Sequence, residues 1–328
     1  MPPPNELLLV CADFNPALAL LRGLGMRIEM IYPADDPHEA LLTHDGRRVR
    51  LTSRPDAPPP SPDLPAFLSE FVVTKAGTEA GEGRAGMHYR DLIPGRLGGR
   101  YIASHIRIAE GGPVADWVHY HRIAVQLICV RKGWVRVVYE DQGDPFVMME
   151  GDMVLQPPRI RHRVLESSPG LEVVEITCPA MHETFADHEM ELPNGKADPA
   201  RSYGGQGFVH HVAASAPWTE WHGAEAQVTV VGDAAGGLVE ARVLRPGPGP
   251  VIAVPPHDGE LVFGFVLDGS GRLDFGEGRR LGPADSFVIP PGEAWRLTHA
   301  SDDFRLLHVS TGKMILPAAS GRSGSGNA

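Results

Sequence analysis

The sequence predicts an all-β protein with two barrels and a small α/β segment at its N-terminus. Short apolar segments follow one another between residues 70 and 316, and glycine, proline, aspartate and serine separate them. The chain contains 38 glycines and 31 prolines, which favours turns over long helices. Two stretches of the chain also repeat one another. Together these observations favour many short strands arranged as two copies of one barrel.

The repeat is visible in two pairs of segments. VQLICVRKGWVRVVYE (125–140) matches LVFGFVLDGSGRLDF (261–275), because each has an apolar strand, a glycine-containing turn and a second strand. GDMVLQPPRIRH (151–162) matches ADSFVIPPGEAW (284–295) in the same way. We therefore expect a first barrel over residues 70–180 and a second over residues 225–316, joined by a less regular connection at 181–224.

The chain before the first barrel divides into two parts. Residues 1–52 form the predicted α/β segment, in which LLLVC (7–11) suits a strand and the next residues, with Asn15 and Pro16 near their start, suit a short helix. The proline-rich stretch at 53–69 is expected to be an extended linker. At the other end of the chain, residues 317–328 are expected to be a flexible tail.

Charge and cysteine content restrict the partners and the compartment. The net charge of −11 disfavours nucleic acid and anionic membrane surfaces as partners. No apolar run is long enough to cross a bilayer, and the N-terminus lacks the pattern of a signal peptide. Cys11, Cys129 and Cys178 are odd in number and widely spaced, which is typical of buried thiols in a reducing cytoplasm. We expect a cytoplasmic protein with a small-molecule partner, and a homodimer that covers sheet edges.

Three histidines of the first barrel are candidate metal ligands. His119 and His121 are two residues apart in a predicted strand, so both side chains can point to the same face. An isolated pair of this kind is often a solvated or core pair, but His162 supplies a third imidazole after the turn at Gly151 and Asp152. Three imidazoles suit Fe, Zn, Mn, Ni or Cu and leave positions for water or substrate.

The residues around these histidines resemble two motifs of the cupin superfamily. HYHRIAVQLICVRKG (119–133) is similar to HxHxxxxE followed by six residues and glycine, and GDMVLQPPRIRH (151–162) is similar to G-x5-P-x-G-x2-H. The resemblance covers residues 70–180, and residues 225–312 as a degenerate second copy. It implies two cupin barrels, of the double-stranded β-helix or jelly-roll type, with one divalent metal ion in the first.

Two positions of the first barrel depart from the motifs. Gln126 stands where the ligand glutamate is usual, and Arg159 where the second motif has glycine. We expect Gln126 to be a weak ligand or a hydrogen-bonding neighbour of the metal, because a neutral amide adds no charge and is no proton acceptor at neutral pH. Arg159, Arg161 and Arg163 share one face of their segment, which predicts a solvated outer face, with an anion-binding patch as the alternative.

The second barrel retains one histidine of the set. His257 stands at the position of His121, whereas Pro255, Val262 and Trp295 stand at the positions of His119, Gln126 and His162. One ligand of four does not hold a metal ion, so we expect a structural role for this barrel.

The ligand set resembles those of gentisate-type and acetylacetone-type dioxygenases. This resemblance implies a metal-dependent dioxygenase acting on a small aromatic or dicarbonyl substrate, with iron as the expected metal and Zn, Mn or Ni as alternatives. Trp117, Arg136 and Tyr139 are candidate substrate-pocket residues, whereas His182 and His188 are expected at the surface of a helical segment. Two other classes stay open. They are a non-redox isomerase or hydrolase, and a non-catalytic cupin that binds a metal or a small molecule.

Overall fold

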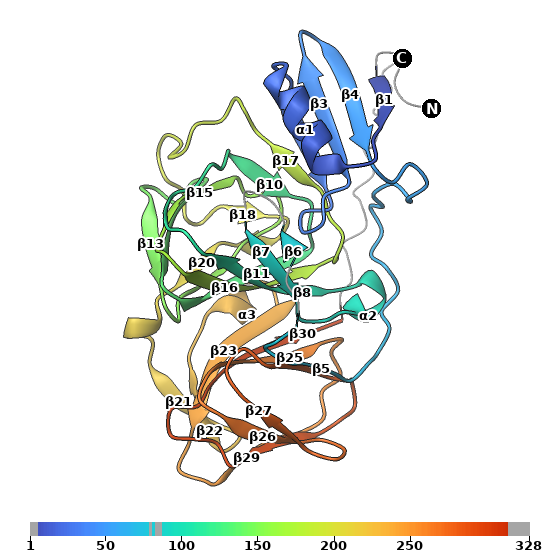
Figure 1. Cartoon of the computed structure of the whole chain (residues 1–328). Helices are drawn as coiled ribbons and strands as arrows, with labels where there is room; N and C mark the ends of the chain where they lie inside the picture. The colour runs from blue at the N-terminus through green and yellow to red at the C-terminus, as the bar shows by residue number, and fades with distance from the viewer. Residues whose placement is uncertain (1–5, 79–80, 83–86, 314–328) are drawn as a thin grey trace, which may run out of the picture.

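Strands dominate the computed structural model of the chain (Figure 1). The structure describes residues 6–78, 81–82 and 87–313. The α-helices within these residues are ten, four and four residues long. The predicted all-β class is therefore confirmed. The predicted tail at 317–328 lies outside the described residues.

The N-terminal module is a four-stranded sheet with one helix packed on it. Phe14, at the start of the helix, packs with Ile28, Ala40 and Leu42 of the sheet. Strand β2 lies at one edge of this four-stranded sheet and pairs with β17 of the first barrel. In this pairing Thr184 lies opposite Ile31. The module therefore extends the sheet that carries His119 and His121. Its elements are β1 (Glu6–Val10), α1 (Phe14–Gly23), β2 (Arg27–Tyr32), β3 (Glu39–His44) and β4 (Arg47–Thr52).

The first barrel is built from two facing sheets. One continues from the N-terminal module in the order β2-β17-β10-β15-β12-β13, and the other has the order β20-β14-β11-β16-β8-β7-β6. The elements of this part of the chain are β5 (Val72–Thr74), β6 (Gly81–Glu82), β7 (His88–Asp91), α2 (Arg96–Gly99), β8 (Ile102–Ile108), β9 (Gly112–Pro113), β10 (His119–His121), β11 (Val125–Lys132), β12 (Trp134–Tyr139), β13 (Phe146–Met149), β14 (Met153–Leu155), β15 (His162–Ser167), β16 (Leu171–Cys178) and β17 (Thr184–Ala186).

The second barrel repeats the arrangement with sheets in the orders β21-β22-β23-β30-β25-β28-β5 and β24-β29-β26-β27. Its elements, with those of the connection before it, are β18 (Ser202–Tyr203), β19 (Gln206–Gly207), β20 (Val209–His211), η2 (Ala213–Ser215), β21 (Trp218–Trp221), β22 (Ala224–Gln227), α3 (Val231–Ala234), β23 (Val239–Pro246), β24 (Val251–Val254), β25 (Val262–Asp268), β26 (Gly271–Asp274), β27 (Arg279–Leu281), β28 (Ser286–Ile289), β29 (Trp295–Thr298) and β30 (Arg305–Thr311).

The two barrels exchange edge strands. β5 lies ahead of the first barrel in the sequence but pairs with β28 of the second, Val73 opposite Phe287. β20 lies after the first barrel's last strand and pairs with β14 of that barrel, Val154 opposite His210. Each pairing covers a strand that would otherwise be a sheet edge, and it ties a segment from the other side of the barrel boundary to that sheet by main-chain hydrogen bonds.

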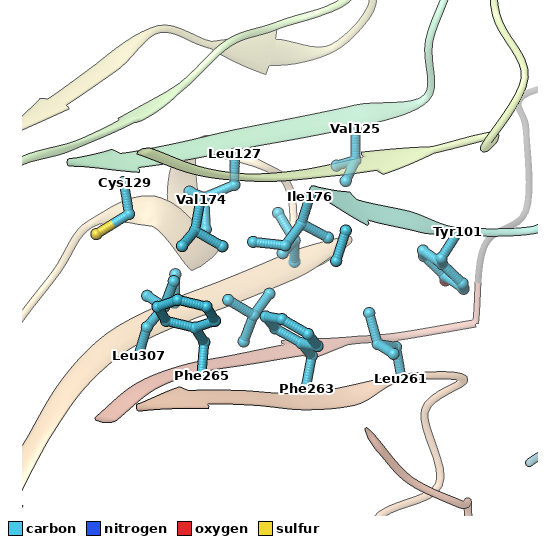
Figure 2. Close-up of a cluster of buried hydrophobic side chains, with 14 of the residues drawn as sticks. Tyr101, Val125, Leu127, Cys129, Val174, Ile176, Leu261, Phe263, Phe265 and Leu307 are labelled. Atoms are coloured by element: carbon cyan, nitrogen blue, oxygen red, sulfur yellow. The ribbon is translucent and has the colours of Figure 1, made fainter. Parts of the chain in front are cut away.

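An apolar core lies between the barrels, and it fixes which residues face the site. Leu127 and Ile176 from the first barrel meet Phe263 and Phe265 from the second, and all four are completely buried (Figure 2). Because side chains alternate along a strand, the residues next to Leu127 point the other way, into the first barrel. This alternation directs Gln126 into the cavity described below.

Candidate metal centre

Strand pairing brings the three candidate ligands together. His119 and His121 flank Tyr120 on β10, and His119 lies directly opposite His162 in the antiparallel pairing with β15. One ring nitrogen of each histidine lies within 4.8 Å of the others. The three side chains are buried, with 1%, 6% and 6% exposure for His119, His121 and His162. Of the described residues, these form the one such group of histidine, cysteine and acidic side chains.

The inner nitrogen of each ring has its own hydrogen-bonding partner. Nδ1 of His119 donates to the carbonyl of Trp117 at 2.7 Å, and Nδ1 of His162 donates to the carbonyl of Ile160 at 3.1 Å. Nδ1 of His121 is 2.9 Å from Oγ1 of Thr184. A ring whose Nδ1 is held in this way presents the lone pair of Nε2, which is the ligand atom of a neutral imidazole. The donor set thus fits a divalent transition metal ion.

A carboxylate lies behind the triad. Oδ1 of Asp116 is 3.6 Å from Nδ1 of His119, and Oδ2 accepts a hydrogen bond from the amide of Val164 at 3.0 Å. The Asp116 side chain is 1% exposed. It therefore links β15 to the loop before β10 and adds negative charge on the side of His119 away from Nε2.

The turn before His162 is held in an unusual backbone conformation. Arg159 has φ 64°, in the left-handed region, which explains why glycine is usual at this position of the motif. An L-residue there costs about 1–2 kcal/mol. The amide of Arg159 donates to the carbonyl of His121 at 3.2 Å, so the turn is tied directly to the strand that carries two of the ligands.

A cavity of about 90 Å³ lies beside the triad, inside the first barrel. Its walls are mainly aliphatic, and Glu175 contributes a carboxylate. The lining residues are Met87, Tyr89, Ile106, Ile108, His121, Gln126, Ile128, Val135, Val137, Tyr139, Met148, Gln156, His162, Val164, Leu171, Val173 and Glu175.

A hydrogen-bonded chain of neutral groups crosses this cavity. The hydroxyl of Tyr139 donates to Oε1 of Gln156 at 2.9 Å, and Nε2 of Gln156 donates to Oε1 of Gln126 at 2.6 Å. The oxygen of Gln126, the one amide atom able to bind a metal, is therefore engaged by Gln156. The ring of Tyr139 stacks on His162 with centroids 5.4 Å apart, and burial raises the pKa of the Tyr139 hydroxyl well above its usual range.

The structure places the other predicted site residues in different surroundings. Tyr139 lines the cavity, as described. Arg136 is not among the lining residues: its side chain is 44% exposed and pairs with Glu166 at 3.3 Å. The ring of Trp117 lies edge-on to His119, with centroids 5.2 Å apart, and packs against the core of the N-terminal module.

The expectation that His182 lies at the surface of a helical segment is wrong. The segment forms the short strand β17 between β10 and β2, and His182 is 3% exposed, its ring edge-on to His121 with centroids 5.3 Å apart. Burial lowers the pKa of His182. His188, by contrast, is exposed and donates from Nε2 to the carbonyl of Ile28 at 2.6 Å.

Sequence reasoning missed four polar groups around the centre. Thr184, Asp116 and Glu175 reach it from strands or loops outside the two motifs, whereas Gln156 lies inside the second motif at a position that the motif leaves open. Gln156 directly precedes Pro157. Its backbone amide donates to the backbone carbonyl of Gln126 at 2.9 Å. A polar residue directly after the apolar strand β14 is the available signal for it.

The equivalent positions in the second barrel are filled by packed side chains. Trp295, at the position of His162, is 1% exposed and lies against Phe287 with centroids 5.4 Å apart. His257, at the position of His121, is within hydrogen-bonding distance of the carbonyl of Ile289 at 3.2 Å.

Known proteins resemble this chain in structure. No protein-family model matches the sequence, and no curated protein matches it. A single-residue variant of oxalate decarboxylase from Bacillus subtilis superposes with a TM-score of 0.54 at 12% identity, covering 78% of this chain and 81% of that one. Salicylate 1,2-dioxygenase from Pseudaminobacter salicylatoxidans gives 0.55 at 17% identity, covering 76% and 86%.

The chain has the cupin fold. At these identities the likeness concerns the fold alone. Among the described helices, none has the length and apolar character required to span a membrane.

Proposed function

We propose that the first cupin barrel binds one divalent metal ion through His119, His121 and His162 and that the protein is a dioxygenase acting on a small aromatic or dicarbonyl molecule. The observation that carries the proposal is the fixed Nδ1 partner of each ring, because it turns three Nε2 atoms toward one point. The structural likeness to a salicylate dioxygenase supports the reaction class.

The surroundings of the triad favour an anionic or polarisable substrate oxygen. Three neutral imidazoles, with Gln126 in place of a carboxylate, would bring no negative charge into direct contact with the ion. When bound, such an ion supplies Lewis acidity and, as iron, redox chemistry with dioxygen. The cavity walls are mainly aliphatic, and the chain from Tyr139 through Gln156 to Gln126 places fixed hydrogen-bonding groups beside the substrate.

Glu175 supplies the proton acceptor that the ligand set lacks. It lines the same cavity as Gln126. On β16 it lies opposite Ile128, which is two residues after Gln126 on β11. A carboxylate at this place can take a proton from a phenol or an enolisable carbonyl compound without occupying the metal.

We further propose that the second barrel binds no metal and serves as a packing partner. Phe287 and Trp295 fill its interior, and its other face forms the core between the barrels. The three cysteines are free, which supports the proposal of a reducing, cytoplasmic compartment.

Elemental analysis of protein purified without added metal tests the proposal. We expect about one iron per chain, lost in His162→Ala and retained in His44→Ala, which removes an exposed imidazole (51% exposed side chain). Oxygen uptake with phenolic acids and diketones then tests the reaction class.

Two outcomes would change the proposal. Zinc or manganese without oxygen uptake would favour the non-redox isomerase or hydrolase class. Full metal content in His162→Ala would contradict the ligand assignment itself.

A further inference from the structure

A second cavity, of about 400 Å³, lies outside the first barrel. It is bounded by the proline-rich linker at Ser61–Leu64, the segment that follows His121, the turn at Arg159, the segment before β17 and Leu238. None of its lining residues lines the barrel cavity. We call it the linker cavity.

The linker cavity carries an unbalanced positive charge. Its ionisable lining residues are Arg122, Arg159 and Glu183. Glu183 is buried and accepts a hydrogen bond from Arg122 at 2.6 Å, so these two charges offset one another. Arg159 is exposed, and within the part of the chain that the structure describes its guanidinium has no side-chain hydrogen bond or ion pair. One arginine is therefore available to a ligand.

The position of Arg159 costs the protein stability. Glycine would adopt its left-handed backbone, φ 64°, without strain. Strained non-glycine residues of this kind gather at functional sites. An arginine at this strained position, among the lining residues of a cavity whose one carboxylate is already paired with Arg122, is a reason to look for an anionic ligand.

The remaining walls suit an apolar body. Ile123, Leu64, Met181 and Leu238 line the cavity together with three prolines. Ligand cavities for small organic molecules measure about 300–1,000 Å³ and combine apolar walls with a few polar groups. The linker cavity has both properties.

The linker cavity and the metal centre share a backbone wall. The amide of Arg159 donates to the carbonyl of His121 at 3.2 Å, and the amide of Arg122 donates to the carbonyl of Glu183 at 3.1 Å, next to Thr184. A ligand in contact with Arg159 would thus lie next to the residue whose backbone amide binds the carbonyl of His121.

We propose that the linker cavity is a binding site for a small organic anion, an apolar body of about one ring bearing a carboxylate, which Arg159 recognises by a charge-assisted hydrogen bond. The site is separate from the metal centre, and its occupation does not require the metal. The inference therefore stands or falls independently of the proposed function.

Methionine methyl resonances distinguish the two cavities. Met181 lines the linker cavity, whereas Met87 and Met148 line the barrel cavity. In metal-free protein labelled with [¹³C-methyl]methionine, benzoate and its uncharged counterpart benzamide are titrated in parallel, and Met181→Leu identifies the Met181 resonance. Benzoate is expected to shift Met181 in a saturable way and to bind about fivefold or more tighter than benzamide.

Variants assign the effect to one arginine. Arg159→Gln keeps a long side chain on the same strained backbone, so it is expected to reduce benzoate binding to the level of benzamide. Arg136→Gln, which removes an exposed arginine paired with Glu166, is expected to leave both probes unchanged.

Three results would overturn the proposal: equal binding of the two probes, benzoate shifts confined to Met87 and Met148, or no shift of Met181 at millimolar benzoate. Metal content measured on the same variants reports on the metal centre separately.

Discussion

Thr184→Val should weaken metal binding without removing a ligand. Thr184 is completely buried, and its Oγ1 lies 2.9 Å from Nδ1 of His121. Valine has nearly the same shape but no hydroxyl, so the ring keeps its space and loses its orienting partner. Losing such a partner typically costs 10–100-fold in metal affinity, which corresponds to about 1.4–2.7 kcal/mol.

A buried threonine elsewhere provides the matched control. Thr74 is 4% exposed and donates from Oγ1 to the carbonyl of Leu92 at 2.9 Å, in the sheet of the second barrel. Both substitutions should lower the free energy of unfolding by about 1 kcal/mol. Only Thr184→Val should lower metal affinity, measured by competition with a chromophoric chelator. Unchanged affinity in Thr184→Val, or an equal loss in Thr74→Val, would refute the reasoning.

Three further predictions concern charge and packing. Gln126→Glu should tighten metal binding by about tenfold or more, because it adds a negative charge beside the ion; weaker binding in the same chelator assay would mean that the side chain points away from the metal. His105 is buried beside Arg90 and Glu172, and burial lowers its pKa from 6.5 to about 4. Between pH 6.5 and 4 the unfolded form therefore binds a proton at His105 that the folded form does not. As the pH falls over this range, the free energy of unfolding of the metal-free protein should decrease by about 3 kcal/mol. Urea unfolding of His105→Gln should lack this decrease, and the same pH dependence in the variant would contradict the assignment. Gly264→Ala should destabilise the second barrel by about 1–3 kcal/mol, because the added Cβ would lie 2.2 Å from Cζ of Phe287; metal content should not change, and unchanged thermal unfolding would show that the ring has room to move.

The ligand histidines could be predicted from the sequence because their geometry is local. Two-residue spacing on a strand places His119 and His121 on one face, and the glycine turn before β14 returns the chain to His162. Their hydrogen-bonding partners could not be predicted in this way. Thr184 is 63 residues from His121, and it reaches the ring only because β17 pairs with β10.

The same limit applies to the fold. Two barrels follow from the repeat, whereas the exchange of β5 and β20 between them depends on pairing across long stretches of chain. The expectation of a helix around His182 is wrong for a related reason. The residues of this segment alone do not reveal a strand, and β17 forms because β10 and β2 offer edges on both sides.

Equivalent strand positions of the two barrels carry different side chains. In the first barrel Gln126 lies opposite Thr177 and Ile128 opposite Glu175. In the second, Val262 lies opposite Ser310 and Gly264 opposite His308, so His308 stands where the first barrel has Glu175.

Gly264 determines which side chain fills the interior of the second barrel. Without a side chain at Gly264, the ring of Phe287 enters the interior and is completely buried there, against Trp295. In the first barrel Ile128 occupies the equivalent place, and a cavity remains beside the histidines. Burial lowers the pKa of His308 to about 3, so this ring stays neutral among packed side chains. Filling by aromatic rings, as well as loss of ligands, thus supports the proposal that metal chemistry is restricted to the first barrel.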